Sequence, residues 1–497
     1  MKRIYAILCC VIISMTVFTP FSVFAFSKTD NTEVELLQAG SFSISDYSAQ
    51  TLSVNAKTAS TVESFIYENL YSHQESFSVQ SYGIAVSDFQ SIYSNVINDN
   101  PELFYVSSSF GYTYIPSSGK IVTITPSYAL TQTEIPQAKV IFEKGIQKAL
   151  RQVDSSMNDA QKALVIHDYI MNLATYPVIN NVSTDDRESY HSAYGLFYDG
   201  YVVCAGYTLA YSAIMQRLGI DCKYVVSSEM QHAWNSLKID GYWYNVDLTF
   251  DDIHFAQGVN ALGTFMHNCF LKSDTAIQST IGFWHSGIQH YSGVTCTNTK
   301  YDSYFWNDVN TNIYVDNGDY IYTNYDTNTR NISINRRTVS GNVTKLNTQT
   351  IAAFYITLTK SNSDGSQTAR VVVPFSKFVK LDNQYFISYV KNLKIYANNN
   401  YSGTPVIDSF DIYTKEMYNL LSNNEFNFTL GVVNGEIGYT TYNNRYDIQT
   451  IPRMSVFTEY YNSTSDTAVY HPYIDANNDK VINAKDFAYI YNAGKKM

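Results

Sequence analysis

Charged side chains are scarce in this sequence of 497 residues: only 15% are Asp, Glu, Lys or Arg, and acidic residues outnumber basic ones by 44 to 33. The formal net charge is −11. Together with the lack of a basic patch, this charge argues against a nucleic-acid partner and against binding to anionic lipid surfaces. Tyrosine is abundant, with 44 residues. Such a composition is typical of a secreted protein of the bacterial surface.

Long apolar runs are also rare. Only residues 4–18 form one, and no other stretch is long and apolar enough to span a bilayer. The run follows Lys2 and Arg3 and precedes residues 23–25, which have the small-x-small pattern of a cleavage site. Residues 1–25 are therefore predicted to be a secretory signal, with an uncleaved membrane anchor as the alternative. Cleavage would remove both basic residues, change the net charge from −11 to −13 and release the chain to the outside of the cell or to its surface.

Cysteine is the third scarce component, with six residues, two of them inside the signal. The other four are too few for a disulfide-dense scaffold in a chain of this length. They are Cys204, Cys222, Cys269 and Cys296. Cys222 begins a β-rich run and is predicted to be a small buried core residue. A bridge between Cys269 and Cys296 stays open.

Cys204 lies where a loop meets an apolar-periodic segment. Residues 208–218 are predicted to be helical, and Gly219 is predicted to end the helix. A cysteine at a helix N-terminus faces unpaired backbone N–H groups and the positive end of the helix dipole. Both favour the thiolate, which is the nucleophilic form of the side chain. Cys204 is therefore predicted to be a nucleophile.

A predicted hairpin follows the helix. His232 opens an alternating strand, residues 240–241 (Asp-Gly) are a strong signal for a two-residue turn, and a return strand is predicted over residues 242–250. This register would place His232 opposite Thr249.

The same register would place Asp247 opposite Trp234, two residues along from His232. Because residues two apart on a strand share a face, His232 and Asp247 would be diagonal neighbours. A carboxylate in that position fixes the tautomer of an imidazole that activates a thiol. Cys204, His232 and Asp247 are therefore the predicted catalytic residues.

Four motifs around these residues resemble the transglutaminase-like superfamily of thiol enzymes in order and spacing. They are Cys-x-Gly-Tyr at 204–207, Leu-Gly-Ile at 218–220, His-Ala-Trp-Asn at 232–235 and Trp-Tyr-x-Val-Asp-x-Thr at 243–249. The resemblance covers roughly residues 155–290 and implies that the cysteine is the nucleophile, the histidine the base and the aspartate its orienter. Family members often carry glutamine, proline and tryptophan where this sequence has Ala205, Leu248 and Phe250.

The resemblance also implies the fold class: an α+β papain/transglutaminase-like core in which the catalytic helix packs on an antiparallel sheet. This catalytic domain is predicted at residues 131–298. A flexible leader (26–55) and a small α+β module (56–130) precede it. An all-β region, sandwich-like or built from repeated hairpins, is predicted at residues 299–463. Its tyrosines suit cross-strand pairs, with binding of carbohydrate or wall polymer as the alternative.

Three other histidines and one run of carboxylates with a histidine have weaker patterns. His167 is predicted to be structural, with a functional second histidine as the alternative, and His191 is close enough in sequence to Cys204 to be considered for the cleft. His285 is predicted to pack at the edge of the catalytic domain. The run of Asp251, Asp252 and His254 matches no metal-ligand spacing, and a metal site there is rejected.

The C-terminal stretch, residues 464–497, carries a second motif. Oxygen-bearing side chains recur at loop positions 1, 3, 5, 9 and 12, which are Asp475, Asn477, Asp479, Asn483 and Asp486. Calcium prefers several oxygens on a tight loop closed by a carboxylate. With the helix predicted at residues 487–491, this pattern predicts a Ca²⁺ site, and a solvated acidic tail is the alternative.

This loop resembles one half of a dockerin, the calcium-dependent module that docks cellulosomal enzymes onto a scaffold. The resemblance implies a scaffold cohesin as partner. Lys480 stands where glycine is usual at loop position 6, and one repeat is present where a dockerin has two.

The sequence therefore predicts secreted, cysteine-dependent acyl transfer on amide or peptide bonds through a thioester, without a catalytic cofactor. Transfer to an amine would make the chain a transglutaminase, and transfer to water a thiol peptidase or amidase. Expected substrates are extracellular proteins or wall peptides. Two other classes stay open: a non-catalytic cell-surface or cellulosome-docked binding protein, and a plant-wall glycoside hydrolase, for which no carboxylate pair is found.

Overall fold

The structure, a computed structural model, describes most of the chain from residue 61 onward. The described ranges are 61–177, 187–252, 266–280, 285–291, 293–326, 328–350, 353–362, 365–374, 377–382, 384–395, 401–411, 415, 417–422, 427–433, 436–441, 448–453, 457, 461–464, 471, 473–477 and 479–495. The predicted signal (1–25) and leader (26–55) lie outside the described residues, as does His254. Among the described helices, none has the length and apolar character needed to cross a membrane.

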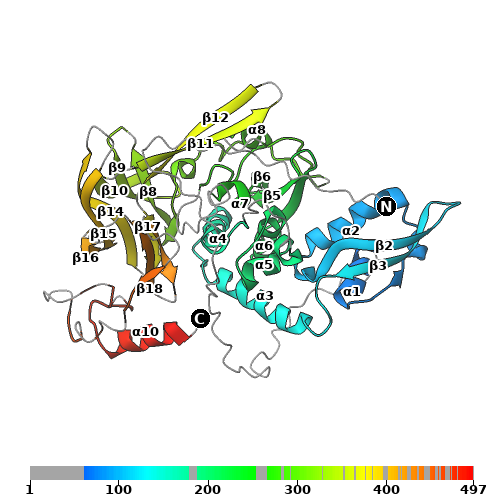
Figure 1. Cartoon of the computed structure of the whole chain (residues 1–497), viewed down its shortest axis with the longest axis horizontal. Coiled ribbons are helices and arrows are strands. Elements are labelled where there is room, and N and C mark those ends of the chain that lie inside the picture. Colours follow the sequence, from blue (N-terminus) through cyan, green and yellow to red (C-terminus); the bar gives the residue numbers. More distant parts are fainter. Residues whose placement is uncertain are drawn as a thin grey trace, which may run out of the picture.

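Two helices and a small antiparallel sheet open the described chain (Figure 1, blue to cyan). The helices are α1 (Val62–Tyr71) and α2 (Val86–Asp99), with short 3₁₀ turns η2 (Gln80–Tyr82) and η3 (Pro101–Leu103). The strands β1 (Phe77–Ser78), β2 (Val106–Ile115) and β3 (Lys120–Tyr128) pair in the order β1-β3-β2. Phe89 and Tyr93 of α2 pack against Phe110 of β2, so one face of the sheet is covered.

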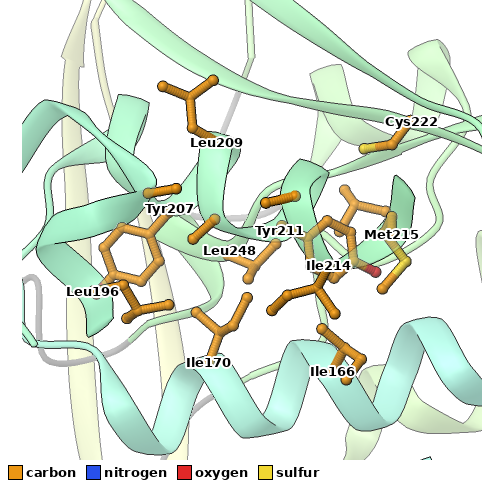
Figure 2. Packing of buried hydrophobic residues seen from close by; sticks show 14 of the residues in the cluster. Ile166, Ile170, Leu196, Tyr207, Leu209, Tyr211, Ile214, Met215, Cys222 and Leu248 are labelled. Atoms are coloured by element: carbon orange, nitrogen blue, oxygen red, sulfur yellow. The ribbon is translucent and has the colours of Figure 1, made fainter. Parts of the chain in front are cut away.

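Two amphipathic helices follow, α3 (Ile135–Leu150) and α4 (Asp159–Leu173). The start of α4 is fixed by a capping box, because Asn158 and Gln161 each accept a hydrogen bond from the other's backbone N–H. The apolar side of α4 carries Ile166 and Ile170, which point toward the central helix (Figure 2). Helix α4 therefore packs against the central helix, which carries Cys204.

That central helix is α6 (Cys204–Arg217), which begins at the cysteine itself, four residues before the predicted start. It is packed by α4, by α5 (Ala193–Tyr198) and by a three-stranded sheet, and Figure 2 shows its side chains among those of the neighbouring elements. Tyr211, fully buried, donates a hydrogen bond to the Ala163 carbonyl of α4 at 3.0 Å. Gly219 follows the helix with φ +73°, as a C-terminal glycine should.

The sheet beside α6 is antiparallel, in the order β4-β5-β6. Its strands are β4 (Cys222–Ser227), β5 (His232–Ile239) and β6 (Tyr242–Val246). The predicted turn is confirmed: Asp240 and Gly241 have φ of +51° and +84°, and Ile239 pairs with Tyr242.

The predicted length of the return strand is wrong. Strand β6 ends at Val246 rather than continuing to residue 250, and the short helix α7 (Leu248–Asp251) follows. The physical cause is Asp247, whose side chain accepts a hydrogen bond from the Phe250 N–H at 3.2 Å and starts a helical turn. The pairing of β5 with β6 therefore stops at Asn235 and Val246, so the predicted pair of His232 with Thr249 is wrong. On its other edge, β5 pairs His232 with Ser227 of β4.

The later part of the chain, after α8 (Asp274–Ser279) and the 3₁₀ turn η6 (Phe305–Asp308), is dominated by antiparallel strands, consistent with the predicted all-β region. One sheet contains β7 (Tyr314–Asp316), β8 (Asp319–Asp326), β9 (Asn331–Arg337) and β10 (Val343–Thr350). A second contains β13 (Lys377–Leu381), β14 (Gln384–Ile395), β15 (Tyr401–Phe410) and β16 (Met417–Ser422).

These two sheets share a buried core. Ile321 and Ile334 of the first lie in one buried cluster with Phe378 and Ile387 of the second, which makes this part sandwich-like. The remaining described elements are a hairpin, a three-stranded sheet and a helix. The hairpin contains β11 (Ala353–Asn362) and β12 (Gly365–Pro374), and the sheet contains β17 (Asn427–Val433), β18 (Glu436–Thr441) and β19 (Gln449–Ile451). The helix is α10 (Ala484–Lys495). In Figure 1 the region around α6 lies between these sheets and the N-terminal helices.

Candidate active site

Cys204 is the first residue of α6, and the packing of that helix fixes its position. No side chain caps the helix at Val203, so the first-turn N–H groups are available to a negative charge near the cysteine. The backbone N–H of Val203 donates to the Tyr190 carbonyl at 2.9 Å. That carbonyl approaches α6 so closely that a Cβ on Gly206 would lie 2.4 Å from it. The glycine in the Cys-x-Gly-Tyr motif is therefore required by close backbone contact.

The predicted imidazole and carboxylate lie together. His232 Nε2 is 2.6 Å from Asp247 Oδ2, and Asp247 is fully buried. The His232 ring stacks on Phe250, with 4.5 Å between ring centroids and 13° between planes, and lies beside Trp234 on its own strand. The diagonal contact expected from the hairpin register is therefore present, even though Asp247 belongs to the cap of α7 and not to the strand.

The electrostatics favour an ion pair between thiolate and imidazolium. Burial raises the pKa of Cys204, but hydrogen bonding and charge from His232, with a backbone hydrogen bond from Ala233, outweigh it and lower the pKa overall. Burial lowers the pKa of His232, while the charge and hydrogen bond of Asp247 raise it to about 10. The ion pair is therefore stable between the lowered pKa of Cys204 and about pH 10.

Asp247 has a second imidazole partner that the sequence did not indicate. His285 Nε2 is 2.8 Å from the same Oδ2 atom, and its ring lies against Trp234 and Phe250. The prediction that His285 packs at the edge of the domain is wrong, because its side chain is buried at the carboxylate. The residue is 38 positions beyond Asp247, outside the hairpin, so no strand register could have placed it.

His167 is buried, as the structural interpretation predicted, and lies in a network of its own. Its Nδ1 is 2.9 Å from Asp168 and its Nε2 is 3.3 Å from Asp251. His267 also contacts Asp168, at 2.9 Å. Burial lowers the pKa of His167, but the two carboxylates raise it to about 9. This network connects α4 to α7 through the contact of His167 with Asp251.

The remaining predicted residues have other surroundings. Asp252, from the rejected metal run, accepts a hydrogen bond from Tyr207 at 2.5 Å. His191 is exposed in the short turn η4 (Glu188–His191). All four cysteines of the described chain are free, so Cys269 and Cys296 form no bridge. Cys222 is buried, as predicted.

The predicted calcium ligands lie on the loop that leads into α10, except Asp486, which is in the first turn of that helix. One oxygen each from Asp475, Asp479 and Asp486 lies within 4.8 Å of the others, and Asp475 and Asp486 are fully buried. The two asparagines bond within the loop. Asn477 bonds to Asp479 through its side-chain amide and carbonyl, and the Asn483 carbonyl accepts from the Lys485 N–H.

We expect iodoacetamide to label Cys204 well below pH 8 and before the other three cysteines. Those three are buried, and burial raises the pKa of Cys222 and of Cys296 to about 12 and that of Cys269 well above its ordinary value. The measurement is the alkylation rate of each cysteine against pH by peptide mass analysis. Cys204 in His232→Asn should react at least about 100-fold more slowly at pH 6, because without the imidazole burial would raise the pKa of the thiol above its ordinary value. Equal, slow labelling of all four would contradict the activated thiol.

We expect His285 to act as a positioning residue for Asp247. His285→Phe leaves Oδ2 with one imidazole donor and should slow Cys204 alkylation at pH 6 by roughly 10- to 100-fold, since small misplacements of an activating group cost this much. His285→Gln retains an N–H donor and should recover most of the rate. Urea unfolding of both variants separates this effect from stability. Equal losses in both variants at matched stability would contradict the positioning role.

Comparisons with known proteins find similarity in one part of the chain. The model of the transglutaminase-like superfamily matches residues 146–248, which include Cys204, His232 and Asp247. Among solved structures, one described as a TGase is 14% identical over 29% of this chain, with a TM-score of 0.21. A proposed cysteine protease from Cytophaga hutchinsonii is 17% identical over 28%, with a TM-score of 0.18.

This chain spans 44% of the first of these structures and 61% of the second. No curated protein matches the chain. The likeness to the transglutaminase-like superfamily thus rests on residues 146–248, the segment that contains α4, α6, the sheet beside α6 and all three predicted catalytic residues.

Proposed function

We propose that this chain is a secreted, cysteine-dependent enzyme that transfers acyl groups from amide or peptide bonds through a thioester. The observation that carries the proposal is the contact of His232 with the buried Asp247 at 2.6 Å, together with the lowered pKa of Cys204 at the start of α6. A structural ion pair alone would not need a partly exposed thiol beside it.

In this mechanism, Asp247 holds Nε2 of His232, which leaves Nδ1 to face the thiol. The Cys204 thiolate attacks the carbonyl carbon, and the carbonyl oxygen becomes an oxyanion near the first N–H groups of α6. Collapse of this intermediate breaks the C–N bond. His232 gives its proton to the leaving amine, and a thioester remains on Cys204.

A second nucleophile then releases the acyl group. His232 removes a proton from an amine or from water, and the thiolate leaves as the new amide or acid forms. An amine acceptor would make the chain a transglutaminase, and water would make it a thiol peptidase or amidase. Extracellular proteins and wall peptides are the proposed substrates, in keeping with the predicted signal at residues 1–25. The alternative is a non-catalytic binding protein, whose binding would not change when Cys204 is replaced.

We expect a glutamine-containing protein to be modified when it is incubated with the chain and a labelled primary amine. Intact-mass analysis would show amine adducts for a transglutaminase, or shorter fragments for a peptidase. Cys204→Ala should abolish either product while remaining folded, because no other thiol in the described chain is both partly exposed and lowered in pKa. Products that persist in Cys204→Ala, or a folded protein that gives neither product from proteins or wall peptides, would oppose the proposal.

We also propose that the loop at residues 475–486 binds Ca²⁺. The supporting observation is the convergence of the Asp475, Asp479 and Asp486 carboxylates, two of them fully buried. Clustered buried carboxylates repel one another unless a cation compensates their charge. Lys480, at the position where glycine is usual, adopts φ +69°, so the loop has the left-handed turn that such a site needs.

A scaffold cohesin is the proposed partner of this module, on the basis of the resemblance to half a dockerin. Its α10 helix exposes Phe487, Tyr489 and Tyr491, each between 45% and 47% accessible. Exposed aromatic side chains on one helix are suited to a protein contact.

We expect Ca²⁺ to raise the melting temperature of the C-terminal part of the chain. Ligand at about 100 times its Kd stabilises the folded state by about 2.7 kcal/mol. Asp486→Asn removes a carboxylate from the cluster and should remove most of this shift, as measured by calorimetry with and without Ca²⁺. Asp326→Asn, at the exposed last residue of β8, is the matched control and should keep the shift. An identical melting temperature with and without Ca²⁺ would contradict the site.

A further inference from the structure

A second group of thiol, imidazole and carboxylate lies away from Cys204. Its members are Asp274 at the start of α8, His290 and Cys296, and one ligand atom from each lies within 4.8 Å of the others. The group touches Ser236 of β5. Ser236 is four residues from His232 on the same strand, so the group lies on the sheet face that carries His232, on the other side of Trp234.

The contacts within this group are specific. His290 Nε2 is 2.7 Å from Asp274 Oδ1, and its Nδ1 is 3.1 Å from the Ser236 hydroxyl. The Cys296 sulfur is 3.6 Å from the same hydroxyl, and the Cys296 N–H donates to Asp274 Oδ2 at 3.3 Å. Asn245 donates to Asp274 Oδ1 at 2.9 Å. Each potential ligand is thus held by a neighbour.

We propose that Asp274, His290 and Cys296 bind a zinc ion. Thiolate, imidazole and carboxylate are the ligands that zinc uses in proteins, and three of them leave a fourth position for water. Bond lengths of about 2.0–2.3 Å place tetrahedral ligand atoms roughly 3.5 Å apart. Separations of up to 4.8 Å would therefore shorten by at most about 1.3 Å, and the 2.7 Å contact of His290 with Asp274 would lengthen by about 0.8 Å. One thiolate and one carboxylate also balance the charge of the ion.

Ser236 supplies the second contact that a metal-bound histidine requires. With zinc on Nε2, the Nδ1–H of His290 would donate to the Ser236 hydroxyl, which fixes the correct tautomer. Cys296 would lose its proton to solvent on binding. Zinc binding would therefore release one proton.

The other polar clusters of the described chain do not suit zinc equally well. The network of His167, Asp168 and His267 is fully buried and satisfied by its own hydrogen bonds. The group around Asp247 belongs to the candidate active site, and the C-terminal loop offers only hard oxygen ligands. In the group at Cys296, by contrast, the side chains of His290 and Asp274 are 13% and 31% exposed, so an ion has a route from solvent.

Zinc at this position would fasten the 285–296 stretch to β5 and α8. That stretch also carries His285, which contacts Asp247. Metal binding would therefore stabilise the fold around the active site without touching the reacting atoms. The inference does not depend on acyl transfer, because none of the three ligands takes part in it.

The test uses the full chain with Cys204→Ala as parent, which removes the reactive thiol from the measurement. Co²⁺ is the probe, because a cysteine ligand gives a near-ultraviolet thiolate-to-cobalt absorption band that oxygen ligands do not give. Zn²⁺ affinity follows from competition against bound Co²⁺. The parent should bind one Co²⁺ with this band, and Zn²⁺ should displace it and raise the melting temperature.

Cys296→Ser should abolish the band and weaken Zn²⁺ binding by at least about 100-fold, the upper end of what even an outer-shell partner contributes. Cys222→Ser is the matched control, since Cys222 is another buried thiol whose pKa is raised to about 12, on β4 of the same sheet. It should keep the band. If Cys296→Ser does not fold, His290→Ala serves instead, and its Zn²⁺ affinity should fall by the same factor. A folded parent that gives no band would overturn the proposal. So would a band that survives in Cys296→Ser, or a Zn²⁺ affinity that is unchanged in His290→Ala.

Discussion

The Asp247 carboxylate is shielded from solvent and accepts hydrogen bonds from His232, His285 and the Phe250 N–H. Burying a carboxylate costs several kcal/mol, and each hydrogen bond to a charged group returns about 1.5–3 kcal/mol. Burial raises the pKa of Asp247, but the charge and hydrogen bonds of His232 and His285 outweigh it and lower the pKa overall. The stability gained is full above the unfolded pKa and is lost as pH falls through the folded one. The orientation of His232, the start of α7 and the position of His285 all depend on this group.

The sequence was sufficient for the local part of this arrangement. Helix termini and two-residue turns follow short-range rules, so the position of Cys204 at a helix start and the hairpin at residues 240–241 could be predicted. The strand was predicted too long because Asp247 was treated as a strand residue. Its tendency to cap a helix decided the local structure instead.

The contacts from outside the hairpin could not be predicted. His285 reaches Asp247 across 38 residues of sequence and Asp251 reaches His167 across 84, with no repeating pattern to relate them. The group of Asp274, His290 and Cys296 has no recognisable ligand spacing either, and only the chain path around β5 brings it together. Such pairs depend on tertiary packing, and no local pattern in a single sequence indicates which distant residues will meet.

Helix α7 has only four residues, too few to be stable alone. Its first turn depends on Asp247, and its last residue, Asp251, bonds to His167 of α4 and to the Cys269 N–H. The Asp251 end is held by α4, and the Asp247 end by His232 and His285. In hydrogen-exchange terms, the amides of Phe250 and Cys269 should belong to the slowest cooperative unit rather than to a local fluctuation. An inhibitor that needs the His232–Asp247 pair to separate would therefore have to wait for rare, large-scale opening, whereas one that approaches Cys204 directly would not.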